Sequence, residues 1–251
     1  YLLDTPTQQR ALEIHGLRPA NPAVPLGAPV DAAHGADPTQ PEHVFASTEA
    51  ATVFAIQDLW QAQRKDVNLA MLLDVSGSME GDKIEQVRRS AVEFVQQMGD
   101  DDRLTVIIFS DLPRILVENT RLGGNRQHII DQINSIVALG GTSLFDSMAY
   151  TAETLRKTGR PDEVTAMVVL TDGQNTVSNY YDSPNEAFRA VVSASGAAVY
   201  TIAYGADADR ATLRDIALAT NGIFYEGDVS TIGDIYGQIS AAFGGSLGIG
   251  R

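Results

Sequence analysis

Residues 67–73 form the most apolar strand-like run in the chain, and a short polar segment, 74–78, follows it at once. A run of this length and composition predicts a strand buried on both faces of a sheet. The segment contributes one carboxylate, Asp74, and two hydroxyls, Ser76 and Ser78. In open α/β sheets, ligands bind at the carboxyl ends of the strands, so these oxygen atoms indicate a binding site at that edge.

The rest of the chain after residue 49 alternates between strand-like and helix-like patterns. Further strands are expected over 103–109, 166–170, 197–204 and 223–225, with a short one over 114–117 that is either parallel or antiparallel. Helices are expected over 50–63, 82–98, 126–137, 143–158, 185–195, 209–219 and 231–243. This order predicts an α/β fold, a doubly wound, Rossmann-like domain with a mostly parallel sheet and helices on both faces.

The first part of the chain differs from this regular pattern. Residues 1–49 hold seven of the ten prolines, and only a helix over 7–17 is expected there. We interpret 1–49 as a proline-rich arm, 50–245 as the α/β domain and 246–251 as a flexible tail. The arm is either an extension lying on the domain or the end of a preceding domain. Because the chain begins with Tyr1, we interpret it as a segment of a longer protein.

Composition excludes several classes of function. The net charge of -14 opposes binding to nucleic acid, whose phosphates would be repelled. The absence of cysteine excludes disulfides, thiolate metal sites and a cysteine nucleophile. No stretch is apolar for the roughly 20 residues that a membrane helix needs, so this segment is not expected to insert into a membrane.

Two more loops carry small polar residues at positions that can reach the same sheet edge, 140–143 and 171–174. Together the three loops suggest five metal-binding residues: Asp74, Ser76, Ser78, Thr142 and Asp172. Oxygen donors without sulfur or imidazole suit Mg²⁺, Mn²⁺ or Ca²⁺ better than zinc or copper. The alternative is structural, because small polar residues also cap helices and form plain turns.

The pattern Asp74-x-Ser76-x-Ser78, followed by Thr142 and then Asp172, resembles the von Willebrand factor type A (VWA) domain family over about residues 66–245. It looks like the metal-ion-dependent adhesion site (MIDAS) of that family. The resemblance implies that Ser76 and Ser78 bind the metal directly and Thr142 directly or through water. Asp74 and Asp172 would act mostly through water, and a Glu or Asp of a protein partner would complete the coordination.

A softer resemblance covers the arm. Its segment 11–22 is similar to the C-terminal end of a bacterial extracellular solute-binding domain. This resemblance implies a bacterial protein that is extracellular or on the cell surface.

Three functions remain open from the sequence. The first is a cation-dependent adhesion or interaction module. The second is the VWA subunit of an intracellular complex of the metal-chelatase type, working beside an ATPase. The third is a Mg²⁺-dependent hydrolase, which we do not expect because position 76 is serine and no phosphate-binding loop is present.

Two smaller features also have alternative interpretations. The acidic run 100–102 is expected to be a solvated turn and not a calcium site. Tyr180 and Tyr181 either line the rim of the metal site or pack on the surface.

Overall fold

The computed structural model describes residues 4–21, 23–35 and 65–242. It divides the chain into two compact units, residues 1–56 and 57–251. The helix expected over 50–63 lies outside the described residues, as does the tail 246–251.

The first unit contains helix α1 (Thr5–His15) and the short 3₁₀ helix η1 (Ala32–His34). Helix α1 ends where Gly16 adopts a left-handed conformation with φ of 61° and its N–H donates to the backbone. Leu12 is buried in this unit. The helix expected here is therefore confirmed, with both ends shifted by two residues toward the N-terminus. That this segment is the remnant of an upstream domain stays a prediction.

The second unit is built on a six-stranded sheet with the order β3-β2-β1-β4-β5-β6. Its strands are β1 (Val67–Asp74), β2 (Arg103–Phe109), β3 (Pro113–Arg121), β4 (Val164–Thr171), β5 (Ala198–Tyr204) and β6 (Phe224–Gly227). Strand β3 is antiparallel to β2, and the other pairings are parallel. All eight residues of β1 are buried, as the continuous apolar run predicts.

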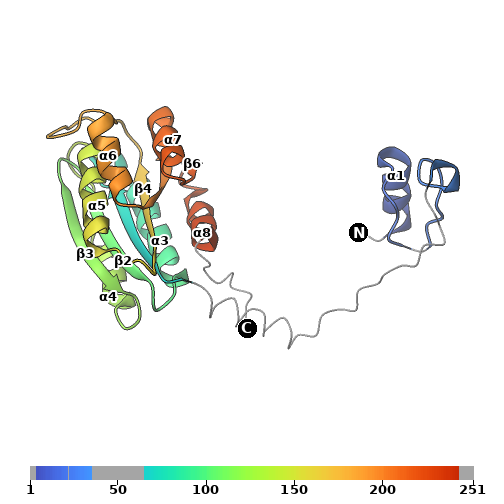
Figure 1. The fold of residues 1–251 in the computed structure, drawn as a ribbon, viewed down its shortest axis with the longest axis horizontal. Helices are drawn as coiled ribbons and strands as arrows, with labels where there is room; N and C mark the ends of the chain where they lie inside the picture. The colour runs from blue at the N-terminus through green and yellow to red at the C-terminus, as the bar shows by residue number, and fades with distance from the viewer. Residues whose placement is uncertain (1–3, 22, 36–64, 243–251) are drawn as a thin grey trace. The chain divides into compact units, whose positions relative to one another are not determined.

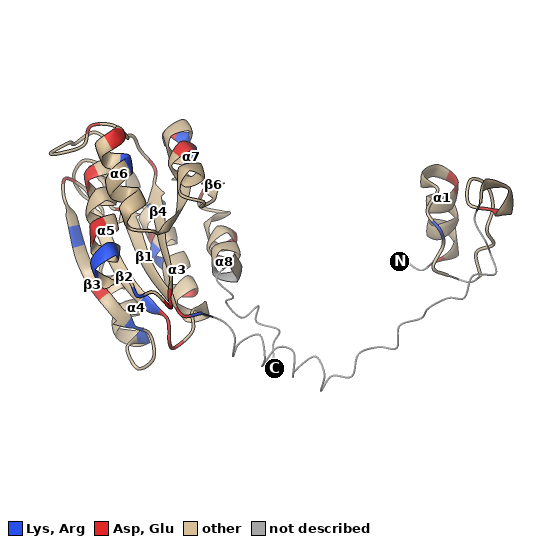
Figure 2. Cartoon of the chain, in the orientation of Figure 1, with Lys and Arg blue, Asp and Glu red and all other residues tan. Residues whose placement is uncertain are grey.

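Helices cover both faces of this sheet (Figure 1). They are α3 (Asp82–Gln97), α4 (Arg126–Asn134), α5 (Leu144–Thr158), α6 (Glu186–Ala194), α7 (Arg210–Ala219) and α8 (Ile232–Ala242). Buried residues of α3, α4 and α8 share one core cluster, and those of α5, α6 and α7 share the other. Most charged residues lie on helices and loops, whereas the central strands carry few (Figure 2). The doubly wound α/β fold is thus confirmed.

In the second unit, two elements differ from the sequence prediction by three residues or more at one end, and the other described boundaries lie within two residues of it. Strand β3 is longer than expected because it is an edge strand, and its outer face carries polar residues that weaken the apolar pattern. Helix α4 ends at Asn134 and not at 137. The Ser135 hydroxyl donates to the carbonyl of Gln132 at 2.7 Å, and beyond it Val137 is exposed.

The interpretation of residues 100–102 as a solvated turn is wrong for Asp102. This carboxylate is buried and accepts hydrogen bonds from the backbone N–H of Val67 at 3.0 Å and of Gly99 at 2.8 Å. It fastens the start of β1 to the turn before β2. Asp100 and Asp101 lie on the surface, where they pair with Arg126 and Arg121.

The topological switch point of the sheet lies between β1 and β4. The helix after β1 packs on one face of the sheet and the helix after β4 packs on the other, so the chain leaves these neighbouring strands in opposite directions. Asp74 ends β1, the loop after it contains Ser76 and Ser78, and the loop after β4 begins with Asp172. Within the described residues, no helix is long and apolar enough to cross a membrane.

Candidate metal site

The carboxylate of Asp74 joins the ends of β1 and β4. Its Oδ1 accepts a hydrogen bond from the backbone N–H of Ser76 at 2.8 Å. Its Oδ2 accepts one from the hydroxyl of Thr171 at 2.6 Å. Asp74 is fully buried, so both of its oxygens are held by protein groups.

The two serine hydroxyls lie next to each other and next to the second carboxylate. The Oγ atoms of Ser76 and Ser78 are 3.1 Å apart. The Ser78 hydroxyl donates to Oδ1 of Asp172 at 2.6 Å. The ammonium of Lys83, in the first turn of α3, contacts Oδ2 of the same carboxylate. Asp172 is therefore tied to the first loop and to α3 at once.

The loop carrying Thr142 completes the cluster. The N–H of Gly77 donates to the carbonyl of Gly140 at 2.9 Å, which joins this loop to the first one. The carbonyl of Thr142 accepts from the N–H of Thr176 at 2.8 Å, which joins it to the loop after β4. A Cβ atom added to Gly173 would lie 3.7 Å from Oγ1 of Thr142. Each pair of the three loops is thus in direct contact.

Helix capping does not explain these hydroxyls. Helix α3 begins after Gly81, and Ser76, at the start of a 3₁₀ turn, makes no side-chain cap. Ser143, which precedes α5, makes no side-chain cap either. The structural alternative of small polar caps is therefore not what holds Ser76, Ser78 and Thr142 in place.

The donor set fits a hard divalent cation. An octahedral ion with ligands at about 2.1 Å needs neighbouring ligand oxygens about 3 Å apart. The 3.1 Å between the Ser76 and Ser78 hydroxyl oxygens meets this requirement. Groups of three or more His, Cys, Asp or Glu that could hold a metal are absent from the described residues, so this mixed hydroxyl and carboxylate cluster is the candidate site there.

Comparison with known families decides which fold family this is. The family model for the von Willebrand factor type A domain matches residues 68–238, which is more than half of the chain. The chain belongs to the VWA family. The match contains the three loops of the candidate site and confirms the family that the sequence motif indicated.

Curated relatives resemble only part of the chain. An uncharacterized protein of Synechocystis, sll0103, is 34% identical over 113 residues, which are 45% of this chain and 26% of that protein. Inter-alpha-trypsin inhibitor heavy chain H4 of Sus scrofa is 28% identical over 174 residues, which are 66% of this chain and 18% of that protein. The chain thus spans about a quarter or less of these relatives.

Solved structures share the fold at low sequence identity. The vWF domain of the type V pili tip protein Mfa5 of Porphyromonas gingivalis has a TM-score of 0.61 at 13% identity, over 75% of this chain and 97% of that one. Proximal thread matrix protein 1 from the mussel byssus, with a zinc-occupied MIDAS motif, has a TM-score of 0.60 at 18% identity. That match covers 72% of this chain and 46% of the byssus protein.

Burial alters the acidity of Asp74 in the VWA domain. Desolvation raises the pKa of this carboxyl from 3.8 to about 6, against the hydrogen bonds from Ser76 and Thr171, which lower it. The nearby charge of Asp172 raises it further. Keeping Asp74 ionised without a bound cation therefore costs free energy near neutral pH.

This cost predicts a pH-dependent effect of Asp74→Asn in metal-free protein. Because the pKa of Asp74 is raised, the folded wild type binds a proton more tightly than the unfolded chain does. Ionisation of Asp74 therefore lowers the free energy of unfolding of the wild type as pH rises from about 4 to about 6. Relative to wild type, D74N should gain up to about 3 kcal/mol in free energy of unfolding between pH 4 and pH 7. Urea denaturation in chelator measures this difference.

Asp131→Asn is the matched control, since Asp131 is exposed on α4. Its difference from wild type should stay flat over the same pH range. A flat difference for D74N as well would contradict the raised pKa.

Sequence reasoning missed three supporting residues. Lys83 is the second residue of α3, and nothing in the sequence pattern distinguishes it from a surface lysine. In the sequence Thr171 is only one of several small polar residues in its loop, although its hydroxyl donates to Asp74. Asp146, in the first turn of α5, accepts hydrogen bonds from three successive backbone N–H groups of residues 179–181. In the sequence, only the place of Asp146 on the inward face of an amphipathic helix could have indicated a structural role.

The two neighbouring tyrosines take different roles. Tyr181 is partly buried and packs edge-on against Phe188, with ring centroids 5.8 Å apart. Tyr180 is 86% exposed. Surface packing therefore describes Tyr181, while most of Tyr180 faces solvent.

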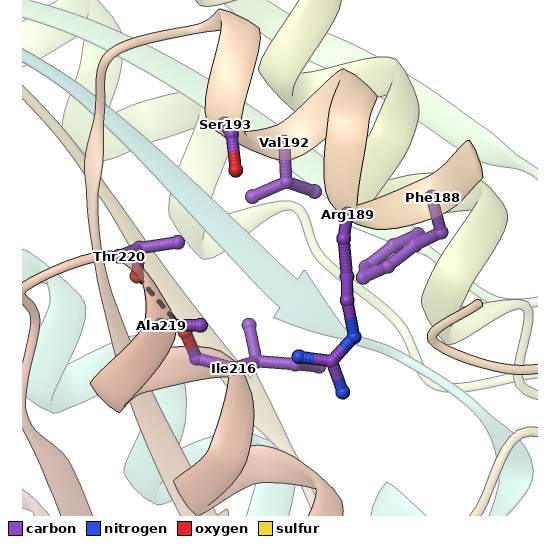
Figure 3. A pocket seen from close by; sticks show the side chains of 7 residues that line it. All are labelled: Phe188, Arg189, Val192, Ser193, Ile216, Ala219 and Thr220. Carbon is purple, nitrogen blue, oxygen red and sulfur yellow. Dashed lines mark hydrogen bonds between the residues drawn. The ribbon is translucent and has the colours of Figure 1, made fainter. Parts of the chain in front are cut away.

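A pocket of about 170 Å³ lies away from this site, between α6 and α7 (Figure 3). Thr220, which lines it, accepts a hydrogen bond from the N–H of Val199 near the start of β5. The pocket therefore faces the amino-terminal edge of the sheet. None of the five predicted metal-site residues lines it.

Proposed function

We propose that this VWA domain is a divalent-cation-dependent binding module that captures an acidic side chain of a protein partner. Ser76 and Ser78 would hold the cation directly, and Thr142 directly or through water. Asp74 and Asp172 would act through hydrogen bonds and water. The bound cation would supply a Lewis-acidic position that attracts an external carboxylate.

The observation that carries this proposal is the state of the two carboxylates. All four of their oxygens already accept hydrogen bonds, from Ser76, Thr171, Ser78 and Lys83. A cation held mainly by neutral hydroxyls keeps most of its positive charge. That charge favours an additional anionic ligand from outside the domain.

The same geometry speaks against catalysis. A carboxylate nucleophile or general base needs an oxygen free to approach its substrate. Asp74 and Asp172 are buried with every oxygen engaged. We therefore propose that the domain binds and does not hydrolyse.

For the cation we propose Mg²⁺, with Mn²⁺ and Ca²⁺ as alternatives. In an octahedral site the hydroxyl separation of 3.1 Å corresponds to bonds of about 2.2 Å, which is closer to the bond length of Mg²⁺ than to the middle of the Ca²⁺ range. The zinc in the MIDAS motif of the byssus protein supports a divalent cation at this place in the fold.

Exposed apolar residues beside the site support a protein as the partner. Three of them lie on loops around it: Leu112, Leu139 and Tyr180. The N–H of Leu139 donates to the carbonyl of Val75 at 2.7 Å, within the first loop. The N–H of Tyr180 donates to Asp146 in the first turn of α5. A partner with apolar residues around its acidic side chain would bury these groups.

We propose an extracellular or bacterial cell-surface location, in keeping with the pilus tip protein of similar fold. The VWA subunit of an intracellular ATPase-associated complex is the alternative. An interaction module is common to both.

Selection of displayed random peptides on the domain tests the binding proposal. In Mg²⁺, enriched peptides should contain Glu or Asp, should be released by EDTA, and should lose binding when that residue becomes Gln or Asn. The Ser76→Ala variant should not retain them. Enriched peptides without an acidic residue, or peptides that resist EDTA, would contradict the proposal.

A further inference from the structure

Lys83 places a positive charge inside the candidate metal site. Its ammonium contacts Oδ2 of Asp172, while Ser78 donates to Oδ1 of the same carboxylate. The Asp172 side chain is 0% exposed and that of Lys83 is 33% exposed. Asp172 therefore has a permanent counter-charge before any cation arrives.

The backbone after β5 lies beside this side chain. A Cβ added to Gly205 would lie 3.8 Å from Nζ of Lys83 and 3.9 Å from its Cε. Gly205 has φ of +89°, a conformation that favours glycine. The ammonium is thus lodged between Asp172 and the backbone after β5, and it is not free to range over the surface.

The charges of the site can be counted from these contacts. Asp74 and Asp172 contribute two negative charges when ionised and Lys83 contributes one positive charge, so these three side chains together carry a net charge of minus one. A divalent cation would bring the site to plus one. Without Lys83, the same cation would bring it to zero.

We propose that Lys83 is a specificity-determining residue of the cation site. It lowers the affinity for the divalent cation by repulsion, and it leaves the loaded site positive, so that an anionic ligand is favoured over a neutral one. This inference rests on the proposed function. It adds that Lys83 weakens binding of the cation and strengthens binding of a carboxylate to the cation-loaded site.

Calorimetric titration of Mg²⁺ alone tests the first half. Lys83→Met removes the charge and keeps most of the aliphatic chain, and it should bind Mg²⁺ at least about tenfold more tightly, because a unit charge a few ångströms from a divalent ion costs more than one factor of ten at intermediate dielectric. Lys83→Arg keeps the charge and should bind Mg²⁺ close to wild type. Lys157→Met, at an exposed lysine on α5, controls for net charge and should change nothing.

Thermal unfolding in EDTA shows whether the Lys83→Met variant is folded, and it also tests the contact between Lys83 and Asp172. In EDTA, Lys83→Met should melt at a lower temperature than wild type and Lys83→Arg, because Asp172 loses its counter-charge. Saturating Mg²⁺ should remove most of this difference.

The second half is measured with an acidic peptide from the selection described above. At saturating Mg²⁺, Lys83→Met should bind this peptide at least about tenfold more weakly, and Lys83→Arg should restore binding. Unchanged or weaker Mg²⁺ affinity in folded Lys83→Met, or equal effects of the Met and Arg variants, would overturn the role of Lys83 and leave the binding module intact. A folded wild type that binds no divalent cation would overturn both.

Discussion

Replacing Ser76 with alanine is expected to abolish the stabilisation of this VWA domain by Mg²⁺. Wild type should gain about 2.7 kcal/mol in free energy of unfolding at a Mg²⁺ concentration a hundred times the dissociation constant. The variant lacks one of the two hydroxyl oxygens that lie 3.1 Å apart. Thermal unfolding followed with increasing Mg²⁺ measures the effect, and the variant should show no shift.

The effect should be specific to cation binding. The Ser76 hydroxyl makes no helix cap, so metal-free S76A should match metal-free wild type within about 1 kcal/mol. Ser193→Ala, at an exposed position on α6, is the matched control and should keep the full response to Mg²⁺. An unchanged Mg²⁺ shift in S76A would mean that the cation binds elsewhere.

Replacing Asp146 with alanine is expected to destabilise the domain by roughly 2–3 kcal/mol, because hydrogen bonds to a charged, buried acceptor are among the stronger ones. Its carboxylate accepts from the N–H groups of Asn179, Tyr180 and Tyr181 at 2.5, 3.1 and 2.8 Å. Without it, three backbone donors in the middle of the loop between β4 and α6 lose their partner. Urea denaturation measures the loss.

Hydrogen exchange separates this local effect from general damage. The amides of 179–181 should exchange much faster in D146A, while those of β1 should follow only the global stability. Asp146→Asn retains one acceptor oxygen and should lose less. Asp131→Ala, at an exposed position on α4, should change stability by less than about 0.5 kcal/mol. Unchanged exchange at 179–181 in D146A would contradict the role assigned to Asp146.

The sequence predicts a strand well where both of its faces are buried. Strand β1 has apolar residues on both faces, and its length and position follow from that run. The edge strand β3 has one polar face, so periodicity reveals only part of it. The end of α4 depends on a hydroxyl of Ser135 that competes for a carbonyl, an effect that apolar spacing does not encode.

The candidate site also contains residues that the sequence predicts and residues that it does not. Its five oxygen-bearing residues are recognisable because they stand at strand ends and helix starts in a fixed order. The residues that hold them are less visible. Thr171 precedes Asp172 as one more small polar residue, and Asp146 and Lys83 lie within helices, where acidic and basic residues are ordinary. Their roles arise from contacts between segments far apart in sequence, as in the Lys83 contact with Asp172.

Asp102 shows why charge patterns alone mislead. Three successive aspartates predict a solvated turn, and two of them do lie on the surface. The third is buried because two backbone N–H groups need an acceptor, that of Val67 at the start of β1 and that of Gly99 in the turn before β2. These two N–H groups belong to other segments of the chain, so the acidic run itself does not reveal that they need an acceptor.

The most direct test of the metal site is a crystal structure of the domain grown with Mn²⁺ and measured at the manganese absorption edge. We predict an anomalous peak in contact with the Ser76 and Ser78 hydroxyl oxygens and beside Thr142, with Asp74 and Asp172 around it. A fully ordered site without such a peak, or a peak confined to acidic residues elsewhere on the surface, would contradict this account.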